Sequence, residues 1–184
     1  MPRKVLILLI LITLTSCGSS KSRRVVTKKS STTKTVKKST TKRKATKRLT
    51  TKTTTIKKTV ATVVKNAKKY EGTRYKYGGT TKKGMDCSGL VYTAFKEADI
   101  NIPRVSSAMA THGNWIDLKK VEIGDLLFFA TAKNSRKVNH VGIVTKASFG
   151  NVEFIHSSTS KGVITSKLEE KYWYFAFVQA RRVL

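Results

Sequence analysis

The spacing of apolar residues along the chain predicts helices first and strands afterwards. Apolar side chains recur every three or four positions in residues 59–70 and again in residues 90–95. This spacing gives one apolar face per segment, which is typical of an amphipathic helix packed on a core. Gly72 follows the first segment and predicts its end. The second segment is predicted to begin at Cys87.

Short segments rich in β-branched and aromatic residues follow, and such segments are typical of strands. They are Leu126–Phe129, Val138–Thr145, Val152–Ser157, Gly162–Ser166 and Phe175–Val183. Residues 106–114 fit either a short helix or a loop. A group of helices followed by a run of strands predicts an α+β domain in which N-terminal helices pack on an antiparallel sheet.

The N-terminal third of the chain has a different composition. Residues 18–59 are mostly Lys, Arg, Thr and Ser, without aromatic residues. The net charge of the whole chain is +28, and 19 Lys and Arg but no acidic residue lie between Lys21 and Lys69. From Glu71 onward there are 17 basic and 10 acidic residues, a net charge of +7. Such a segment buries too little apolar surface to offset its ordering entropy, so we expect a disordered basic arm over residues 17–59 and a folded domain over residues 60–184.

This basic arm has two readings. The simpler one is a solvated tether, and the other adds electrostatic attraction to an anionic polymer or membrane surface. Nucleic acid is the usual partner of such a charge. Residues 1–16 predict export, however, and an exported chain rarely meets DNA. We therefore do not expect nucleic-acid binding.

The first 16 residues predict export. Arg3 and Lys4 precede the apolar run 5–14, which is shorter than the ~20 residues that a membrane-spanning helix needs. The sequence that ends at Cys17 resembles a bacterial lipobox. This resemblance implies a signal peptide over residues 1–16 and lipid on the Cys17 thiol, whereas the alternative is an ordinary secretory signal with a chance cysteine. Because Gly18 is not an acidic retention signal, analogy favours an outer-membrane anchor that faces the periplasm.

Cys87 is the second of only two cysteines. Asp86 is a good N-cap residue, so Cys87 is expected in the first turn of a helix, where free N–H groups favour an anion. This position predicts that the pKa of the Cys87 thiol is lowered and that Cys87 acts as a nucleophile. The alternative is an inert buried cysteine. A disulfide with Cys17 is possible on paper, but the predicted lipid already occupies Cys17.

Two histidines supply the base that a thiol nucleophile needs. His140 begins one predicted strand and His156 ends the next, and a short loop predicts that these strands form a hairpin. The two side chains are therefore expected to be neighbours at one end of the sheet, which predicts a Cys–His–His site with Cys87. A zinc site is the competing use of these residues, but it lacks a fourth closely spaced ligand, so no metal is expected. His112 has no such context.

Several motifs together resemble the NlpC-type cell-wall cysteine peptidases, and most closely the outer-membrane murein endopeptidase lipoproteins of that family. They are Tyr75-Lys76-Tyr77-Gly78-Gly79, Asp86-Cys87-Ser88-Gly89, Pro103-Arg104, Gly124-Asp125-Leu126, His140-Val141-Gly142-Ile143 and His156. The resemblance implies a papain-like α+β fold and hydrolysis of amide bonds in the peptide stems or cross-links of peptidoglycan, without a cofactor. The bonds include the γ-D-glutamyl–diaminopimelate bond.

The resemblance also implies roles for individual residues. Cys87 is the expected nucleophile, His140 the general base and acid, and His156 the group that orients His140. Tyr75 is expected to help bind the oxyanion. Positions that shape the substrate cleft are matched by Asp86, Ser88, Arg104 and Ser106. Two other uses of the same scaffold remain open: a non-catalytic lipoprotein that binds the cell wall, and an acyltransferase or amidase.

Overall fold

The computed structural model describes the backbone of residues 41–184 and the side chains of residues 53–184. The predicted signal peptide, Cys17 and the arm up to residue 40 lie outside the described residues. Helix α1 spans Thr41–Lys68, so the predicted start at Thr59 was wrong, and residues 41–59 are helical where disorder was expected. No Gly or Pro occurs between Ser19 and Glu71, and therefore nothing in this segment interrupts a helix.

Three further α-helices and one 3-10 helix follow in the described part of the chain. They are α2 Cys87–Lys96, α3 Ser106–Met109, the 3-10 helix Leu118–Lys120 and α4 Lys171–Ala176. The predicted start of α2 at Cys87 is confirmed. A small hairpin of β1 (Thr80–Thr81) and β2 (Gly84–Met85) immediately precedes α2.

Six strands form one antiparallel sheet in the order β3-β8-β4-β5-β6-β7. The strands are β3 Asn114–Ile116, β4 Leu126–Phe129, β5 His140–Ser148, β6 Asn151–Ser158, β7 Gly162–Lys167 and β8 Phe177–Arg182. The predicted α+β class is therefore confirmed. The last predicted strand was wrong at its start, because residues 175 and 176 close helix α4 and β8 begins at Phe177.

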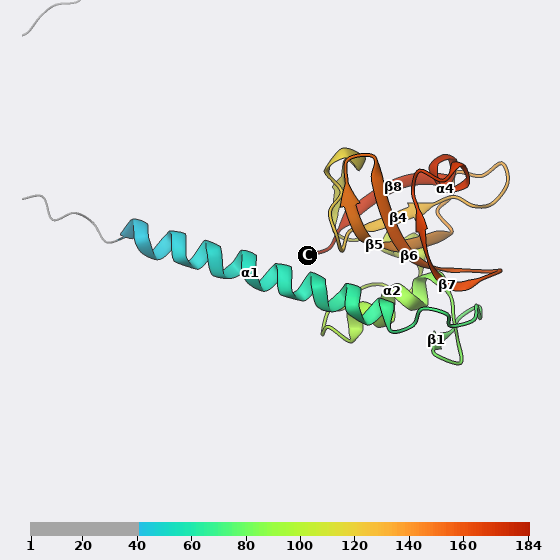
Figure 1. Cartoon of the computed structure of the whole chain (residues 1–184), viewed down its shortest axis with the longest axis horizontal. Coiled ribbons are helices and arrows are strands. Elements are labelled where there is room, and N and C mark those ends of the chain that lie inside the picture. Colours follow the sequence, from blue (N-terminus) through green and yellow to red (C-terminus); the bar gives the residue numbers. More distant parts are fainter. Residues whose placement is uncertain (1–40) are drawn as a thin grey trace, which may run out of the picture. The chain divides into compact units, whose positions relative to one another are not determined.

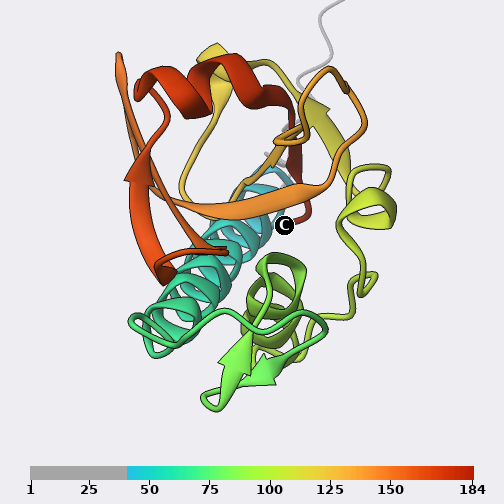
Figure 2. The same cartoon turned by 90° about the vertical axis from the view of Figure 1, so that its right-hand side faces the viewer.

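The sheet buries apolar side chains on both of its faces. Helices α1 and α2 cover one face and α4 lies on the other (Figures 1 and 2). On the first face, Val63 of α1 and Phe95 of α2 pack in one cluster with Ile143 of β5 and Ile155 of β6. The second face buries a separate cluster around Trp173 of α4. The site described below combines residues of α2 on the first face, of the sheet itself and of α4 on the second face.

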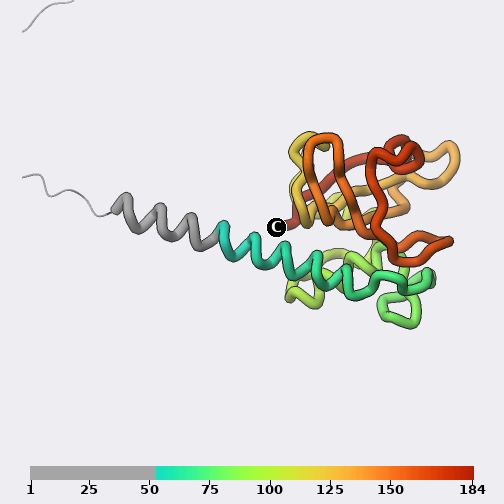
Figure 3. The backbone as a smooth tube through the Cα atoms, in the orientation of Figure 1, coloured from blue at the N-terminus to red at the C-terminus, as the bar shows by residue number. Residues whose placement is uncertain are grey.

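The C-terminus returns to the first helix. Val183 and Leu184 pack against the cluster that contains Val63, and the chain ends beside α1 in Figure 3. Among the helices of the described chain, none combines the length and the apolar character that crossing a membrane requires.

Candidate active site

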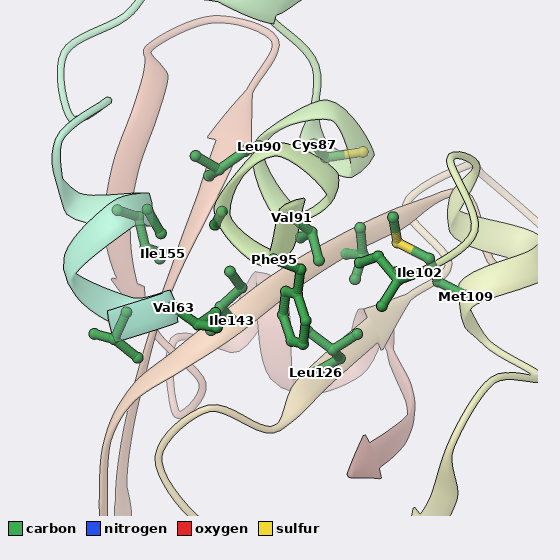
Figure 4. Close-up of a cluster of buried hydrophobic side chains, with 14 of the residues drawn as sticks. Val63, Cys87, Leu90, Val91, Phe95, Ile102, Met109, Leu126, Ile143 and Ile155 are labelled. Atoms are coloured by element: carbon green, nitrogen blue, oxygen red, sulfur yellow. The ribbon is translucent and has the colours of Figure 1, made fainter. Parts of the chain in front are cut away.

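The first turn of α2 holds Cys87 in a fixed position. Asp86 has an extended backbone and caps the helix, accepting a hydrogen bond of 2.5 Å from the N–H of Gly89. A Cβ atom on Gly89 would lie 2.1 Å from the carbonyl oxygen of Gly79, so only glycine allows this close approach. Leu90 and Phe95 face the sheet, whereas the sulfur of Cys87 points away from these side chains (Figure 4).

The Cys87 thiol contacts the backbone on both sides of His140. Its Sγ lies 3.9 Å from the carbonyl oxygen of Asn139, to which the thiol donates. The N–H of Val141 donates a hydrogen bond to the same sulfur. Cys87 and His140 therefore meet at the start of β5, as the sequence predicts. The hydrogen bond of the thiol goes to the Asn139 carbonyl, however, and not to the imidazole.

The two predicted histidines are neighbours. Nε2 of His140 lies 3.1 Å from Nδ1 of His156, and both rings are buried. The β5–β6 register, extended from Ile143 opposite Ile155, places Gly142 opposite His156, so the two histidines lie diagonally across the ladder. A Cβ atom on Gly142 would lie 3.2 Å from Cβ of His156, and this glycine lets the ring lie close to β5.

Further side chains contact the histidine pair. One is Phe154, whose ring centroid lies 5.0 Å from that of His156, and two others, Trp173 and Ser166, were not identified from the sequence. Trp173 of α4 stacks on His140 with ring centroids 5.3 Å apart and meets His156 edge-on at 4.6 Å. Ser166 of β7 places its Oγ 3.1 Å from Nε2 of His156. The pattern of residues 162–166 predicted a strand that includes Ser166, but no sequence motif marked this serine as a partner of a histidine.

Burial determines the protonation states of the site. It raises the pKa of the Cys87 thiol, and the carboxylate of Asp86 adds to this effect. The N–H groups of Val141 and Ser88 lower that pKa without overcoming burial, so the predicted lowering of the thiol pKa was wrong. Burial also lowers the pKa of His140 to about 4 and that of His156 to about 3. At neutral pH the resting site thus holds a neutral thiol and two neutral imidazoles.

Tyr75 lies beside the nucleophile. It forms an isolated β-bridge with Met85, two residues before Cys87. Burial is the main cause that raises the pKa of its phenol, and the proximity of Cys87 and of Asp86 raises this pKa further. The predicted position of the tyrosine hydroxyl near the sulfur is therefore consistent with the structure, and its role stays a prediction.

Asp86, Ser88 and Arg104 form one hydrogen-bonded cluster at the start of α2. Arg104 donates from both guanidinium ends to the carboxylate of Asp86, each at 3.1 Å, and also to Oγ of Ser88 at 2.9 Å. Gly78 N–H donates to the same carboxylate at 2.7 Å. Burial alone would raise the pKa of Asp86, but Arg104 and the backbone donors hold it below its usual value. Ser106, the first residue of α3, takes no part in this cluster.

Among the side chains of residues 53–184, no three of His, Cys, Asp or Glu are grouped so that they could hold a metal ion. The side chains that the structure brings together at the site are a thiol, two imidazoles and a tyrosine hydroxyl, and a thiol beside an imidazole suits nucleophilic catalysis.

The buried histidine pair is expected to make folding sensitive to acid. Unfolded histidine has a pKa of about 6.5, whereas the folded pKa values are about 4 and about 3. Below pH 6.5 the unfolded chain therefore binds protons that the folded chain does not, and stability falls as the pH falls toward 4. Each histidine contributes a loss of about 1.4 kcal/mol per pH unit in this range.

Urea unfolding at pH 7, 6 and 5 measures this effect. His156→Gln should make the free energy of unfolding depend less on pH, and His112→Gln, outside the buried pair, serves as the matched control. Equal pH dependence in wild type and His156→Gln would contradict the burial of a neutral pair.

Residues 72–182 match the model of the NlpC/P60 family. The chain is 43% identical over 114 residues to a probable endopeptidase NlpC homolog of Haemophilus influenzae. This match covers 61% of this chain and 57% of the relative. It is 40% identical over 116 residues to the murein DD-endopeptidase MepS/murein LD-carboxypeptidase of Escherichia coli, covering 62% of this chain and 58% of the relative. The chain thus spans a little over half the length of these relatives.

The fold has solved counterparts. A crystal structure described as similar to lipoprotein, NLP/P60 family, from Staphylococcus aureus superimposes with a TM-score of 0.60 at 32% sequence identity. The match covers 69% of this chain and 42% of that one.

Proposed function

The chain belongs to the NlpC/P60 family, and on that premise we propose that it is a cysteine peptidase of the bacterial cell envelope. Its substrates are amide bonds in the peptide stems or cross-links of peptidoglycan. The candidate bonds are the γ-D-glutamyl–diaminopimelate bond and the diaminopimelate cross-link. The second matches the name of the Escherichia coli relative, a murein DD-endopeptidase. The observation that carries this proposal is the contact of Cys87 Sγ with the residues on both sides of His140, whose ring is paired with His156 at 3.1 Å.

The proposed mechanism begins with a neutral pair. The S–H of Cys87 turns from the Asn139 carbonyl toward Nδ1 of His140, which has no hydrogen-bond partner among the described residues. The proton moves to this nitrogen as the sulfur attacks the amide carbonyl, because burial favours neither a free thiolate nor a free imidazolium. His156 accepts a hydrogen bond from Nε2–H of His140 and so stabilises the cation that forms.

The remaining steps use the same groups. The tetrahedral oxyanion accepts hydrogen bonds from the Cys87 backbone N–H and from the Tyr75 hydroxyl. His140 then gives its proton to the leaving amine, and the C–N bond breaks to leave a thioester on Cys87. Water attacks this thioester, again with His140 as base, and releases the acid and the free thiol. We expect the cluster of Asp86, Ser88 and Arg104, together with Ser106, to border the path by which the peptide reaches Cys87.

Digestion of defined muropeptides tests this function. The full chain is incubated with cross-linked dimers and with monomeric stems, and the products are identified by mass spectrometry. We expect two fragments whose masses together exceed that of the substrate by one water, from a single amide bond. Binding without cleavage would instead support a non-catalytic wall-binding protein. Transfer of the acyl group to an added amine in preference to water would support an acyltransferase.

A lipid on Cys17 is the proposed anchor. This proposal depends on the sequence pattern of residues 1–17, with cleavage before Cys17 and an outer-membrane location facing the periplasm. Labelled palmitate should enter the wild-type protein in growing cells and should not enter Cys17→Ala. Equal labelling of both proteins would end this proposal.

The basic arm, which we propose is a tether, can also attract the protein to an anionic wall or membrane surface. In the described part of the arm, residues 53–58 are exposed and include Lys57 and Lys58 but no acid. Deleting residues 19–40 leaves α1 whole. This variant should bind purified sacculi more weakly at low salt, and the difference should vanish at high salt. Unchanged binding at low salt would contradict the electrostatic attraction, and the arm would then act as a tether alone.

A further inference from the structure

A third side chain extends the histidine pair into a chain of hydrogen bonds. Ser166 lies in β7, with 7% of its surface exposed, and His156 is completely buried. The contacts run from Nε2 of His140 to Nδ1 of His156 at 3.1 Å and from Nε2 of His156 to Oγ of Ser166 at 3.1 Å. Among the described residues, His156 is the only side-chain hydrogen-bond partner of this hydroxyl. The second ring therefore has both of its nitrogens engaged.

Each of these contacts holds one hydrogen atom, so only two neutral arrangements are possible. In the first, Nε2–H of His140 donates to His156, and Nε2–H of His156 donates to Ser166. Nδ1 of His140 then carries a lone pair and can accept a proton. In the second, Ser166 donates to His156, His156 donates to Nε2 of His140, and Nδ1 of His140 carries a hydrogen. The second arrangement leaves His140 without a free lone pair that could take the proton of Cys87.

The reaction itself favours the first arrangement. When His140 becomes an imidazolium, both of its nitrogens carry hydrogen, so Nε2–H must donate to a lone pair on Nδ1 of His156. His156, which stays neutral, then carries its hydrogen on Nε2 and needs an acceptor there. Oγ of Ser166 is the atom within hydrogen-bond distance. Starting from the second arrangement, protons on both rings would have to move before the thiol could react.

We propose that Ser166 is a positioning residue whose hydroxyl oxygen accepts the Nε2–H of His156 when His140 is protonated, and so supports the arrangement in which Nδ1 of His140 is free to take the thiol proton. This inference rests on the proposed function, because it concerns the base of that reaction. Ser166 does not contact the nucleophile, and it acts only through the tautomers of the two rings. Removing its oxygen leaves a buried N–H of His156 without an acceptor in the first arrangement, whereas in the second it leaves only a nitrogen lone pair without a donor. The loss should therefore shift the equilibrium toward the second arrangement.

Nitrogen-15 NMR of labelled histidine in the full chain tests this proposal directly. In the wild type we expect Nε2 of both rings to carry hydrogen and Nδ1 of both to be bare. Ser166→Ala should mix the two tautomers and lower kcat roughly tenfold, part of the 10²- to 10⁴-fold that general base catalysis contributes. KM should change little, because Ser166 is buried behind His156. Ser166→Thr, which keeps the hydroxyl in a strand, should restore both the tautomers and kcat.

Ser157→Ala is the matched control. Ser157 is a completely buried serine that follows His156 in β6, and its Oγ donates to the Met85 carbonyl at 2.7 Å instead of bonding to either imidazole. Its loss should leave the tautomers unchanged. Wild-type tautomers in Ser166→Ala, or a wild type with hydrogen on Nδ1 of His140, would overturn the proposal. If the tautomers shift as expected but the wild type cleaves no muropeptide, the proposed function fails and the positioning role stands.

Discussion

Replacing Cys87 with alanine is expected to abolish the release of peptides from purified sacculi, with kcat/KM falling by about 10⁴-fold or more. The proposed reaction passes through a thioester on this sulfur, and removal of a covalent nucleophile leaves only the binding energy of the cleft. The measurement is the rate at which soluble fragments appear, together with the binding of the variant to sacculi. Binding should persist, because the backbone donors and the Asp86 cluster remain in place.

The controls separate loss of chemistry from loss of fold. Cys87→Ser keeps a side chain of similar shape and should be nearly as inactive, because a hydroxyl is a weaker nucleophile beside a base of low pKa. His112→Gln lies outside the site and should keep full activity. Thermal unfolding of all three variants should be close to that of the wild type. Fragment release by Cys87→Ala at even a few per cent of the wild-type rate would refute the proposed nucleophile.

The second large effect is expected at Asp86. Asp86→Asn removes the charge that pairs with Arg104 and weakens the acceptor for the N–H groups of Gly78 and Gly89. Breaking a buried ion pair costs about 3–5 kcal/mol. Since 32% of the Arg104 side chain is exposed, a loss of about 2 kcal/mol in unfolding free energy is expected here. Activity should fall by about tenfold or more, because Asp86 fixes the turn that presents Cys87.

The chain contains a matched control for this variant. Asp125 is buried and pairs with Arg182 through two contacts of 2.8 Å, and it also accepts from the N–H of Glu122. Asp125→Asn should cost a similar amount of stability, and kcat/KM measured well below the unfolding temperature should stay near the wild-type value. Equal losses of activity in the two variants would show that Asp86 acts through global stability alone.

The parts of the site that depend on short segments could be predicted from the sequence. The cap at Asp86 and the apolar spacing after Cys87 are contained within ten residues, and they located the start of α2. The short loop between two strands was sufficient to bring His140 and His156 together. In each case the determining interactions lie within one helix or one hairpin, so they can be inferred from the residues themselves.

Other features depend on tertiary structure and could not be inferred in this way. Trp173 comes from a helix whose aromatic residues resemble a strand in sequence, and Ser166 is one polar residue in an ordinary strand. The thiol pKa depends on how deeply Cys87 is buried, which the position of a helix start does not reveal. The start of α1 was misjudged because composition suggested disorder in residues 41–59, although no residue there breaks a helix.

Trapping the acyl-enzyme tests the central claim most directly. The full chain is mixed with a defined muropeptide, quenched with acid within one turnover and digested, and the peptides are mapped by mass spectrometry. The account predicts a thioester on the peptide that contains Cys87, with the added mass of the acyl half of the substrate. Turnover in which Cys87 is never modified, or an adduct on a different residue, would contradict it.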